Sequence, residues 1–412
     1  MAKQLLILGH VWPEPKTTAA GRRMEQLLEA FLDLGYRITF ASTAKMTPHG
    51  LDLESIGVKT APILLNHPGF DVFVREENPD LVIFDRFMVE EQFGWRVAEQ
   101  APGALRLLNT EDLHSLRKAR EEAHKGGRDF SPQQWREHPM VLRELASLYR
   151  SDCSLIISSY ELELLIGSGV PRSQLLYLPF MVAPLSRETV EKWPAYGERK
   201  DFICIGNGRH APNVDSIAHL RRSIWPLIRR ELPQIKLHIH GAYLPQQVLE
   251  MHDPKAGFLV AGWTADLALT FQAARLLLAP LHFGAGIKGK LLEAMYHGTP
   301  SITSPIGAEG MHGELPWNGA VIQDPAEFAM AAVELYRNQE LWDRAQGNGV
   351  ELINAHYDKN RLLPTLKEGL ATLENHLESH RSGNLIGRML MDQVHASNKY
   401  MAKWIQAKNK LG

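Results

Sequence analysis

The sequence has few cysteines and no long apolar run. Its 412 residues include two cysteines, Cys153 and Cys204, each in or beside a short apolar run typical of a strand. Such positions favour buried free thiols in a reducing compartment over disulfides or a cysteine metal site. No apolar run approaches the roughly 20 residues of a membrane-spanning helix. The first residues lead directly into a strand, which leaves no room for a signal peptide. We therefore expect a soluble, cytoplasmic protein.

The sequence also lacks an excess of either charge. Its formal net charge is −2, which argues against nonspecific binding to nucleic acid as its main activity. A chain of this length exceeds what one hydrophobic core usually supports, so two domains are expected.

The first half alternates short apolar runs with amphipathic helices. A strand over residues 4–9 precedes a helix whose apolar side chains recur at helical spacing, and a second strand follows over residues 37–42. This strand–helix–strand order predicts a parallel, doubly wound sheet with right-handed crossovers. Further strands are expected at residues 80–85, 105–109, 153–158 and 175–179.

The alternation stops over residues 183–199, which we interpret as an interdomain linker. A second set of strands then follows at residues 202–205, 236–240, 258–260, 276–281 and 320–322. We expect a first domain over residues 1–182, a second over 200–355, and C-terminal helices over 356–412 that partly pack back on the domains. Ligands bind at the carboxyl ends of the strands in such sheets, so two facing domains predict a cleft between them.

Two further segments are polar. The mixed charges of residues 113–151 are most simply solvated helix faces. The basic segment 381–410 carries apolar residues near helical spacing: Ile386, Leu390, Val394, Met401 and Ile405. We expect this helix to dock onto the protein's own domains. The alternative is a helix that binds a partner or lies peripherally on the inner membrane face.

A glycine-rich loop at residues 283–289 is the strongest functional signal. It carries three glycines and Lys288, it follows a buried strand, and Lys290 stands in the first turn of the next helix. Backbone N–H groups at a helix N-terminus, joined by two lysines, predict a phosphate site. We expect a nucleoside diphosphate to bind there.

Two other interpretations of this loop stay open. Residues 284–289 match G-x-G-x-x-G, the dinucleotide fingerprint, with Glu309 as a ribose contact. The position deep in the second half and the two lysines are unusual for that motif. A purely structural tight turn is the other alternative.

The glycine loop and its helix read Phe283-Gly-Ala-Gly-Ile-Lys-Gly-Lys-Leu-Leu-Glu-Ala-Met-x-x-Gly-x-Pro, and Gly307-Ala-Glu-Gly follows. This stretch resembles the donor-binding signature of the family-4 retaining glycosyltransferases of the GT-B fold. Further support for this resemblance comes from Ile205-Gly-Asn-Gly-Arg-His-Ala-Pro-Asn-Val-Asp215 and from Gly262-Trp263. In the first half, the family pattern is matched more loosely by Thr18-Ala-Ala-Gly21 and residues 110–117. The resemblance implies an α/β protein with two tandem Rossmann-like domains facing a cleft. It also implies retaining transfer of a hexosyl or N-acetylhexosaminyl group from a UDP- or GDP-linked sugar. The acceptor would be a glycan, lipid-linked or other glycoconjugate.

The same resemblance assigns roles to individual residues. Glu293 matches the second glutamate of the family's E-x7-E motif, which bonds the donor ribose, whereas the first glutamate would fall at Ala285. Backbone N–H groups of Ala285–Ile287 would then hold the sugar. Asn207 and Asn213 stand where many members carry an arginine and a lysine, so other cations must hold the diphosphate. The implied diphosphate and sugar site is Arg209, His282, Gly284, Ala285, Gly286, Ile287, Lys288 and Lys290. The implied nucleoside site is Gly241, Gly262, Trp263 and Glu293, and the acceptor-side loop contains Ala20 and Gly21.

The implied chemistry needs positive charge near the leaving diphosphate. The sequence contains no Asp-x-Asp motif, and lysines with a helix dipole can do the same electrostatic work. We therefore expect no metal site and no cofactor beyond the donor. Catalytic candidates are Glu111, Asp112 and His114, together with Lys288.

Several of these assignments have alternatives. Asp112 could cap a helix that starts at Leu113, His114 could lie on the surface, and Arg117 and Arg120 could be surface charges or acceptor contacts. Two other functions stay open for the whole chain. One is a nucleotide-sugar epimerase of the same fold, and the other is a non-catalytic subunit that binds sugar nucleotides.

Overall fold

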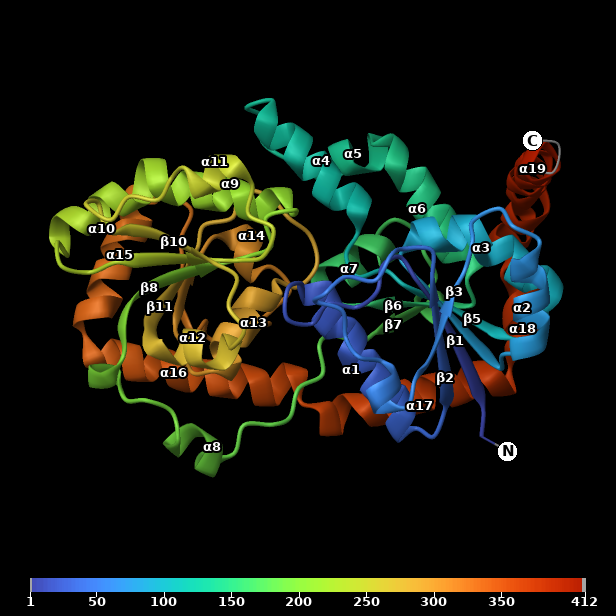
Figure 1. Cartoon of the computed structure of the whole chain (residues 1–412), viewed down its shortest axis with the longest axis horizontal. Coiled ribbons are helices and arrows are strands. Elements are labelled where there is room, and N and C mark those ends of the chain that lie inside the picture. Colours follow the sequence, from blue (N-terminus) through green and yellow to red (C-terminus); the bar gives the residue numbers. More distant parts are fainter. Residues whose placement is uncertain (1, 410–412) are drawn as a thin grey trace.

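The chain folds into two α/β domains that lie side by side (Figure 1). A computed structural model describes residues 2–409, without the side chains of residues 393–398 and 409. Each domain is a parallel sheet with helices on both faces. The prediction of two doubly wound Rossmann-like domains is confirmed.

The first domain is built on a seven-stranded sheet in the order β3-β2-β1-β4-β5-β6-β7, with every neighbouring pair parallel. Its central strands are buried on both faces, which explains why they are continuous apolar runs and not alternating ones. The strands are β1 (Gln4–Gly9), β2 (Arg37–Ser42), β3 (Lys59–Pro62), β4 (Leu81–Asp85), β5 (Leu105–Asn109), β6 (Cys153–Ile156) and β7 (Leu175–Tyr177).

The helices of this domain follow the expected apolar periodicity. In α1, Met24, Leu27 and Phe31 are buried, and the Thr18 side chain caps the N-terminus by accepting a hydrogen bond from the Gly21 N–H. The helices are α1 (Ala19–Asp33), α2 (Gly69–Glu77), α3 (Phe87–Gln100), α4 (His114–Lys125), α5 (Pro132–Glu137), α6 (Pro139–Arg150) and α7 (Ser159–Ile166).

The second domain has a six-stranded parallel sheet in the order β10-β9-β8-β11-β12-β13. Its strands are β8 (Lys200–Ile205), β9 (Leu237–His240), β10 (Phe258–Gly262), β11 (Ala274–Ala279), β12 (Ser301–Thr303) and β13 (Gly319–Val321). Its helices are α9 (Ala211–His219), α10 (Trp225–Glu231), α11 (Gln246–Leu249), α12 (Leu267–Ala273), α13 (Gly289–Tyr296), α14 (Pro305–Ala308), α15 (Pro325–Arg337) and α16 (Gln339–Leu352). A π-helical turn at Leu220–Ile224 joins α9 to α10.

Most charged residues of the polar insert lie on exposed or partly exposed helix faces, as expected, but three of them are buried. Helices α4 and α6 bury Arg120, Glu144 and Arg150 together with apolar residues of the same helices. Charge is tolerated there because each of these groups has a charged or hydrogen-bonding partner, as between Arg150 and Glu90. Figure 1 shows α4 above the boundary between the two domains.

The segments outside the two sheets tie the domains together. Residues 183–199 contain the short helix α8 (Arg187–Glu191), and Val182 forms a parallel bridge with Asp358. Beyond this bridge α17 (Lys359–Asn375) runs back beneath the first domain (Figure 1), where Leu366 and Leu370 join its core.

The chain then continues through α18 (Leu377–Gly383) into α19 (Leu385–Asn409), which packs against α3 and α6. Near its end Lys399 pairs with Glu99 of the first domain. The α19 side chain of Val394 lies outside the described residues. Within residues 2–409 the helices are too short or too polar to cross a bilayer.

Candidate active site in the interdomain cleft

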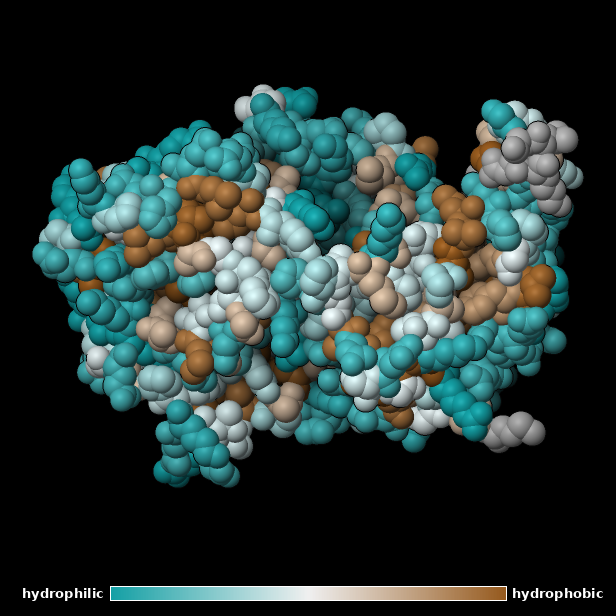
Figure 2. All heavy atoms as spheres, viewed as in Figure 1, coloured by the Kyte–Doolittle hydropathy of each residue, from teal (hydrophilic) through white to brown (hydrophobic). Residues whose placement is uncertain are grey.

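The carboxyl ends of the two sheets face one another across a cavity of about 600 Å³. This is the position at which doubly wound sheets bind ligands, and the volume suits a small organic ligand. Figure 2 shows the surface hollowed between the two domains. Both domains supply the lining, so a ligand in this cavity would contact both.

The glycine loop joins β11 to α13 and lies against the first domain. Gly286 has φ +63°, and a Cβ placed there would lie 2.8 Å from the Cβ of Asp112. A Cβ at Gly289 would lie 2.6 Å from that of Ala19. These glycines therefore let the two domains approach each other closely, in addition to shaping the turn.

Two lysines bring positive charge to the cavity wall. Lys288 is 8% exposed and donates to the Gly286 carbonyl at 2.8 Å. Burial lowers its pKa to about 8, against the opposing effect of Glu309. Lys290 donates to the Asn213 side-chain oxygen at 2.7 Å, and burial lowers its pKa as well. With the N-terminus of α13, these ammonium groups form an anion site.

The loop amides are less available than the sequence analysis expected. The Gly286 N–H donates to the Glu161 carboxylate at 2.8 Å, so it is not free to hold a sugar. Ala285 packs against the apolar core of the first domain. Glu161 comes from α7, and it also accepts from the Leu113 N–H at 3.0 Å. The Gly286 amide is thus engaged by Glu161, while Gly286 itself lines the cavity, and its expected contact with the donor stays a prediction.

The ends of β4 and β5 form the first-domain wall of the cavity. Arg86 and Glu111 follow these strands with φ of +75° and +61°, a backbone conformation that is strained for such residues. The Asn109 amide donates to Glu111 at 2.8 Å and to Asp85 at 3.3 Å. Burial, reinforced by the charge of Asp85, raises the pKa of Glu111 to about 8. Such a group carries its proton at neutral pH.

Asp112 forms an ion pair and does not cap α4. Burial would raise the pKa of Asp112, but the bound Arg117 guanidinium and the nearby His114 hold it well below its usual range. The Nε2 atom of His114 lies 3.3 Å from the Asp112 carboxylate. Burial lowers the pKa of His114 to about 3, so its ring is neutral. The cavity thus contains an ionised carboxylate beside a protonated one.

The capping role belongs to Glu144. Its carboxylate, from α6, accepts from the N–H groups of His114 and Ser115 at 2.9 and 3.1 Å. The capping interpretation of Asp112 and the surface interpretation of His114 are therefore wrong. Both errors have one cause, because the sequence does not reveal that α6 brings a carboxylate to the start of α4.

The expected nucleoside end of the cavity contains Glu293 and aromatic side chains. Glu293 lies on α13, 3.7 Å from the Arg22 guanidinium and 3.4 Å from His297. Trp263 is 43% exposed, and its indole N–H donates to the Lys16 carbonyl of the first domain. Arg209 stacks on the ring of Tyr243, with its guanidinium carbon 3.7 Å from the ring centroid. This end therefore offers both a carboxylate and rings for stacking.

Most of the residues selected from the sequence share this cavity. The wall includes Ala20, Gly21, Arg209, Gly241, Trp263, Gly284, Ala285, Gly286, Ile287, Lys288, Lys290 and Glu293, as well as Glu111, Asp112 and His114. Two expected contacts, Gly262 and His282, do not line it. His282 instead points to Asp215, with Nδ1 2.7 Å from a carboxylate oxygen.

Several wall residues were missed by the sequence analysis: Asp85, Arg86, His210 and Tyr243. Asp85 had a usable signal, since it ends a buried strand whose carboxyl end was expected to face the cleft. The other three stand on loops whose paths only the tertiary structure defines.

Replacing Glu111 with glutamine is expected to stabilise the protein increasingly as pH rises. The pKa of Glu111 is raised from 4.5 to about 8 in the folded state, so its favourable contribution is complete below pH 4.5 and is lost as pH rises through 8. The difference between Glu111→Gln and wild type should grow by up to about 1.4 kcal/mol per pH unit across this window. Urea denaturation at pH 5.5, 7 and 8.5 measures it. The control variant Glu188→Gln, at an exposed position, should show no such trend. If the unfolding free energies of Glu111→Gln and wild type change in parallel with pH, the prediction is contradicted.

Comparison with known proteins agrees with the fold. Residues 199–338 match the family model described as glycosyl transferases group 1. Sucrose-phosphate synthase from Thermosynechococcus elongatus superposes with a TM-score of 0.66 and 17% identity, covering 90% of this chain and 99% of that one. Anabaena Alr3699/HepE, solved with UDP and glucose, gives a TM-score of 0.65 and 13% identity over 90% of this chain and 99% of its own.

One sequence relative is an "Uncharacterized 44.6 kDa protein in cps region" of Klebsiella pneumoniae. It is 22% identical over 176 residues, which is 40% of this chain and 45% of that protein. The match thus spans less than half of that relative. The chain has the two-domain GT-B fold of solved glycosyltransferases, and its second domain is similar to the group 1 glycosyl transferases.

Proposed function

We propose that this protein is a glycosyltransferase that moves a sugar from a nucleoside-diphosphate sugar to a glycan, lipid-linked or other glycoconjugate acceptor. The observation that carries the proposal is the pair Lys288 and Lys290 at the N-terminus of α13, inside a cleft that both domains line. The match of residues 199–338 to the group 1 glycosyl transferases supports it. So does the neighbouring structure with UDP and glucose, Anabaena HepE.

The chemistry requires stabilisation of the diphosphate as the glycosidic bond breaks. Negative charge then grows on the leaving phosphate, and preorganised donors aimed at that charge lower the barrier. We assign this role to Lys288 and Lys290 with the N-terminal amides of α13. Since these groups belong to the protein, the proposed transfer is metal-independent.

We further propose that the transfer retains the configuration at the anomeric carbon. In this scheme the leaving phosphate accepts the proton of the acceptor hydroxyl. Asp112, ionised beside Arg117, and the protonated Glu111 stand on the first-domain wall beside the glycine loop. There they orient the acceptor through hydrogen bonds, one as an acceptor and the other as a donor.

A thermal-shift panel tests the donor class. A ligand that binds the folded state stabilises it according to its affinity, so UDP- or GDP-linked hexoses and N-acetylhexosamines should raise the melting temperature, whereas NAD should not. Product analysis with and without an acceptor follows. Interconversion of the free sugar nucleotide would indicate an epimerase. Binding without hydrolysis or transfer to any tested acceptor would favour a non-catalytic subunit.

Glu293→Ala is expected to weaken nucleotide binding by about 1–3 kcal/mol, because the proposed hydrogen bonds from the ribose hydroxyls to this carboxylate would be lost. Calorimetry with the nucleotide selected by the panel measures the change. Glu25→Ala is the matched control, since Glu25 also pairs with Arg22 but does not line the cavity. Equal losses in the two variants would show that Glu293 acts only through Arg22.

A further inference from the structure

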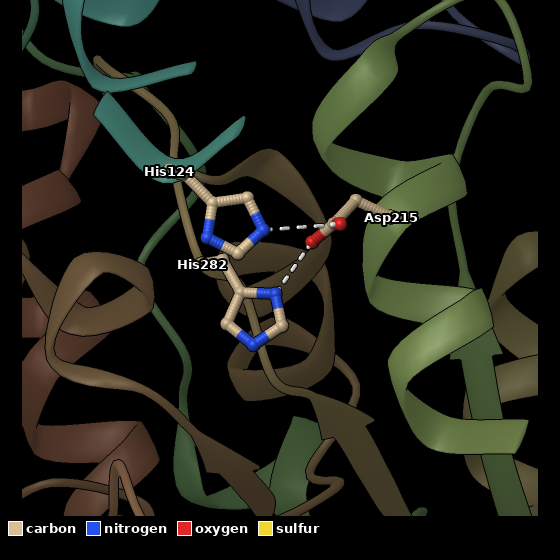
Figure 3. Close-up of side chains that lie close together, drawn as sticks. All are labelled: His124, Asp215 and His282. Atoms are coloured by element: carbon tan, nitrogen blue, oxygen red, sulfur yellow. Dashed lines mark hydrogen bonds and ion pairs between the residues drawn. The ribbon is translucent and has the colours of Figure 1, made fainter. Parts of the chain in front are cut away.

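Two histidines and an aspartate converge at the seam between the domains, outside the cavity (Figure 3). His124 comes from the last turn of α4 in the first domain, Asp215 from α9, and His282 from the segment after β11. One ligand atom from each residue lies within 4.8 Å of the other two. These residues play no part in the proposed transfer, so the cluster needs its own explanation.

The cluster combines one hydrogen bond with one contact of metal-ligand spacing. The Nδ1 atom of His282 lies 2.7 Å from one Asp215 oxygen, which is a hydrogen bond. The Nε2 atom of His124 lies 3.4 Å from the other oxygen, which is long for an N–H···O bond. Donors bound to one tetrahedral zinc ion at about 2.0–2.2 Å lie about 3.3–3.6 Å apart. The 3.4 Å separation between His124 and Asp215 is thus the donor–donor distance expected around a tetrahedral zinc ion.

The surroundings also suit a cation. The rings of His124 and His282 stack with centroids 4.4 Å apart beside one carboxylate, and the ring of His219 lies 4.2 Å from that of His282. Two imidazoles and a carboxylate are donors that zinc and related ions prefer, and here they meet at ligand distance. The side chains of His124, Asp215 and His282 are 36%, 28% and 22% exposed, so an ion can reach them from solvent.

We propose that His124, Asp215 and His282 bind a divalent transition-metal ion of the zinc class. Because His124 alone comes from the first domain, an ion held by all three side chains links the domains. Its binding energy therefore favours the closed cleft over an open one. The site is structural and stands beyond the cavity wall, and its argument does not rest on the proposed transferase activity.

Zinc binding by the full-length protein tests the site. Equilibrium dialysis with metal analysis should find one zinc ion bound per wild-type chain. The conservative variants Asp215→Asn and His282→Gln should each weaken binding by at least about tenfold. His238→Ala is the matched control, since His238 also pairs with an aspartate, Asp201, but without a third ligand. It should bind zinc as wild type does. No stoichiometric zinc in wild type, or unchanged affinity in both variants, would overturn the proposal.

Two further readouts guard against misfolded variants. Cobalt added to the wild type should produce the visible absorption of a tetrahedral site, and Asp215→Asn should lose that absorption while keeping wild-type circular dichroism. Small-angle scattering should show zinc reducing the radius of gyration of wild type but not of His124→Ala. An equal compaction of both would refute the link between the domains.

Discussion

Lys288→Ala is expected to lower kcat/KM for the sugar nucleotide by about 10²–10³-fold, the usual cost of removing one preorganised donor to a transition-state charge. The lysine is buried at the cavity wall and donates to the loop carbonyl of Gly286. Its ammonium group is thus held in place before substrate arrives. An equal fall in kcat and kcat/KM would assign it to the transition state, whereas a rise in KM alone would assign it to ground-state binding.

The measurement is steady-state release of the nucleoside diphosphate, with circular dichroism to confirm folding. Exposed Lys236, which precedes β9 in the same domain, provides the control, and Lys236→Ala should behave as wild type. Because burial lowers the pKa of Lys288 to about 8, kcat/KM of the wild type should also fall as pH rises through about 8. Full activity in Lys288→Ala would remove the lysine from the diphosphate site.

Arg120→Ala is expected to destabilise the closed arrangement of the domains by about 2–5 kcal/mol, because it truncates one partner of a buried charge pair. Its guanidinium donates to both Glu309 oxygens at 2.8 and 2.7 Å and to the Gly284 carbonyl at 2.8 Å. Arg120 belongs to the first domain and its partners to the second. The pair therefore closes the cleft behind the glycine loop.

The variant should show a larger radius of gyration by small-angle scattering and weaker nucleotide binding, since only the closed fraction presents the complete site. Arg143→Ala is the matched control. Arg143 forms a bidentate pair with Glu91 in the same domain but is exposed and distant from the interface, so its loss should cost under about 1 kcal/mol. Wild-type scattering from Arg120→Ala would contradict the prediction.

The role of Glu309 illustrates how a motif can be found without its function. Under a dinucleotide interpretation, the spacing predicts Glu309 as a ribose contact. In the structure its carboxylate is bound by Arg120. The ribose assignment of Glu309 rested on its spacing from the glycine loop. Spacing cannot show that Arg120, 189 positions earlier in the chain, lies beside Glu309.

The sequence by itself determined the two parallel sheets, the break between them and the glycine loop with its lysines. These features are local, because a buried parallel strand is a short apolar run, and a phosphate-binding turn needs glycines beside a helix start. Lys288, Lys290 and Glu293 stand within six residues on one loop and helix. Their common placement at the cavity follows from the path of that one segment.

Only the tertiary structure decided what the charges of α4 do. Arg117, Arg120 and His124 lie on one side of this helix at three- and four-residue spacing, and a sequence cannot distinguish such a face from a solvated one. Their partners are Asp112, Glu309 and Asp215, and the latter two belong to the other domain. A charged side chain is buried only when a partner reaches it. That partner is set by how the two domains meet, which no local pattern encodes.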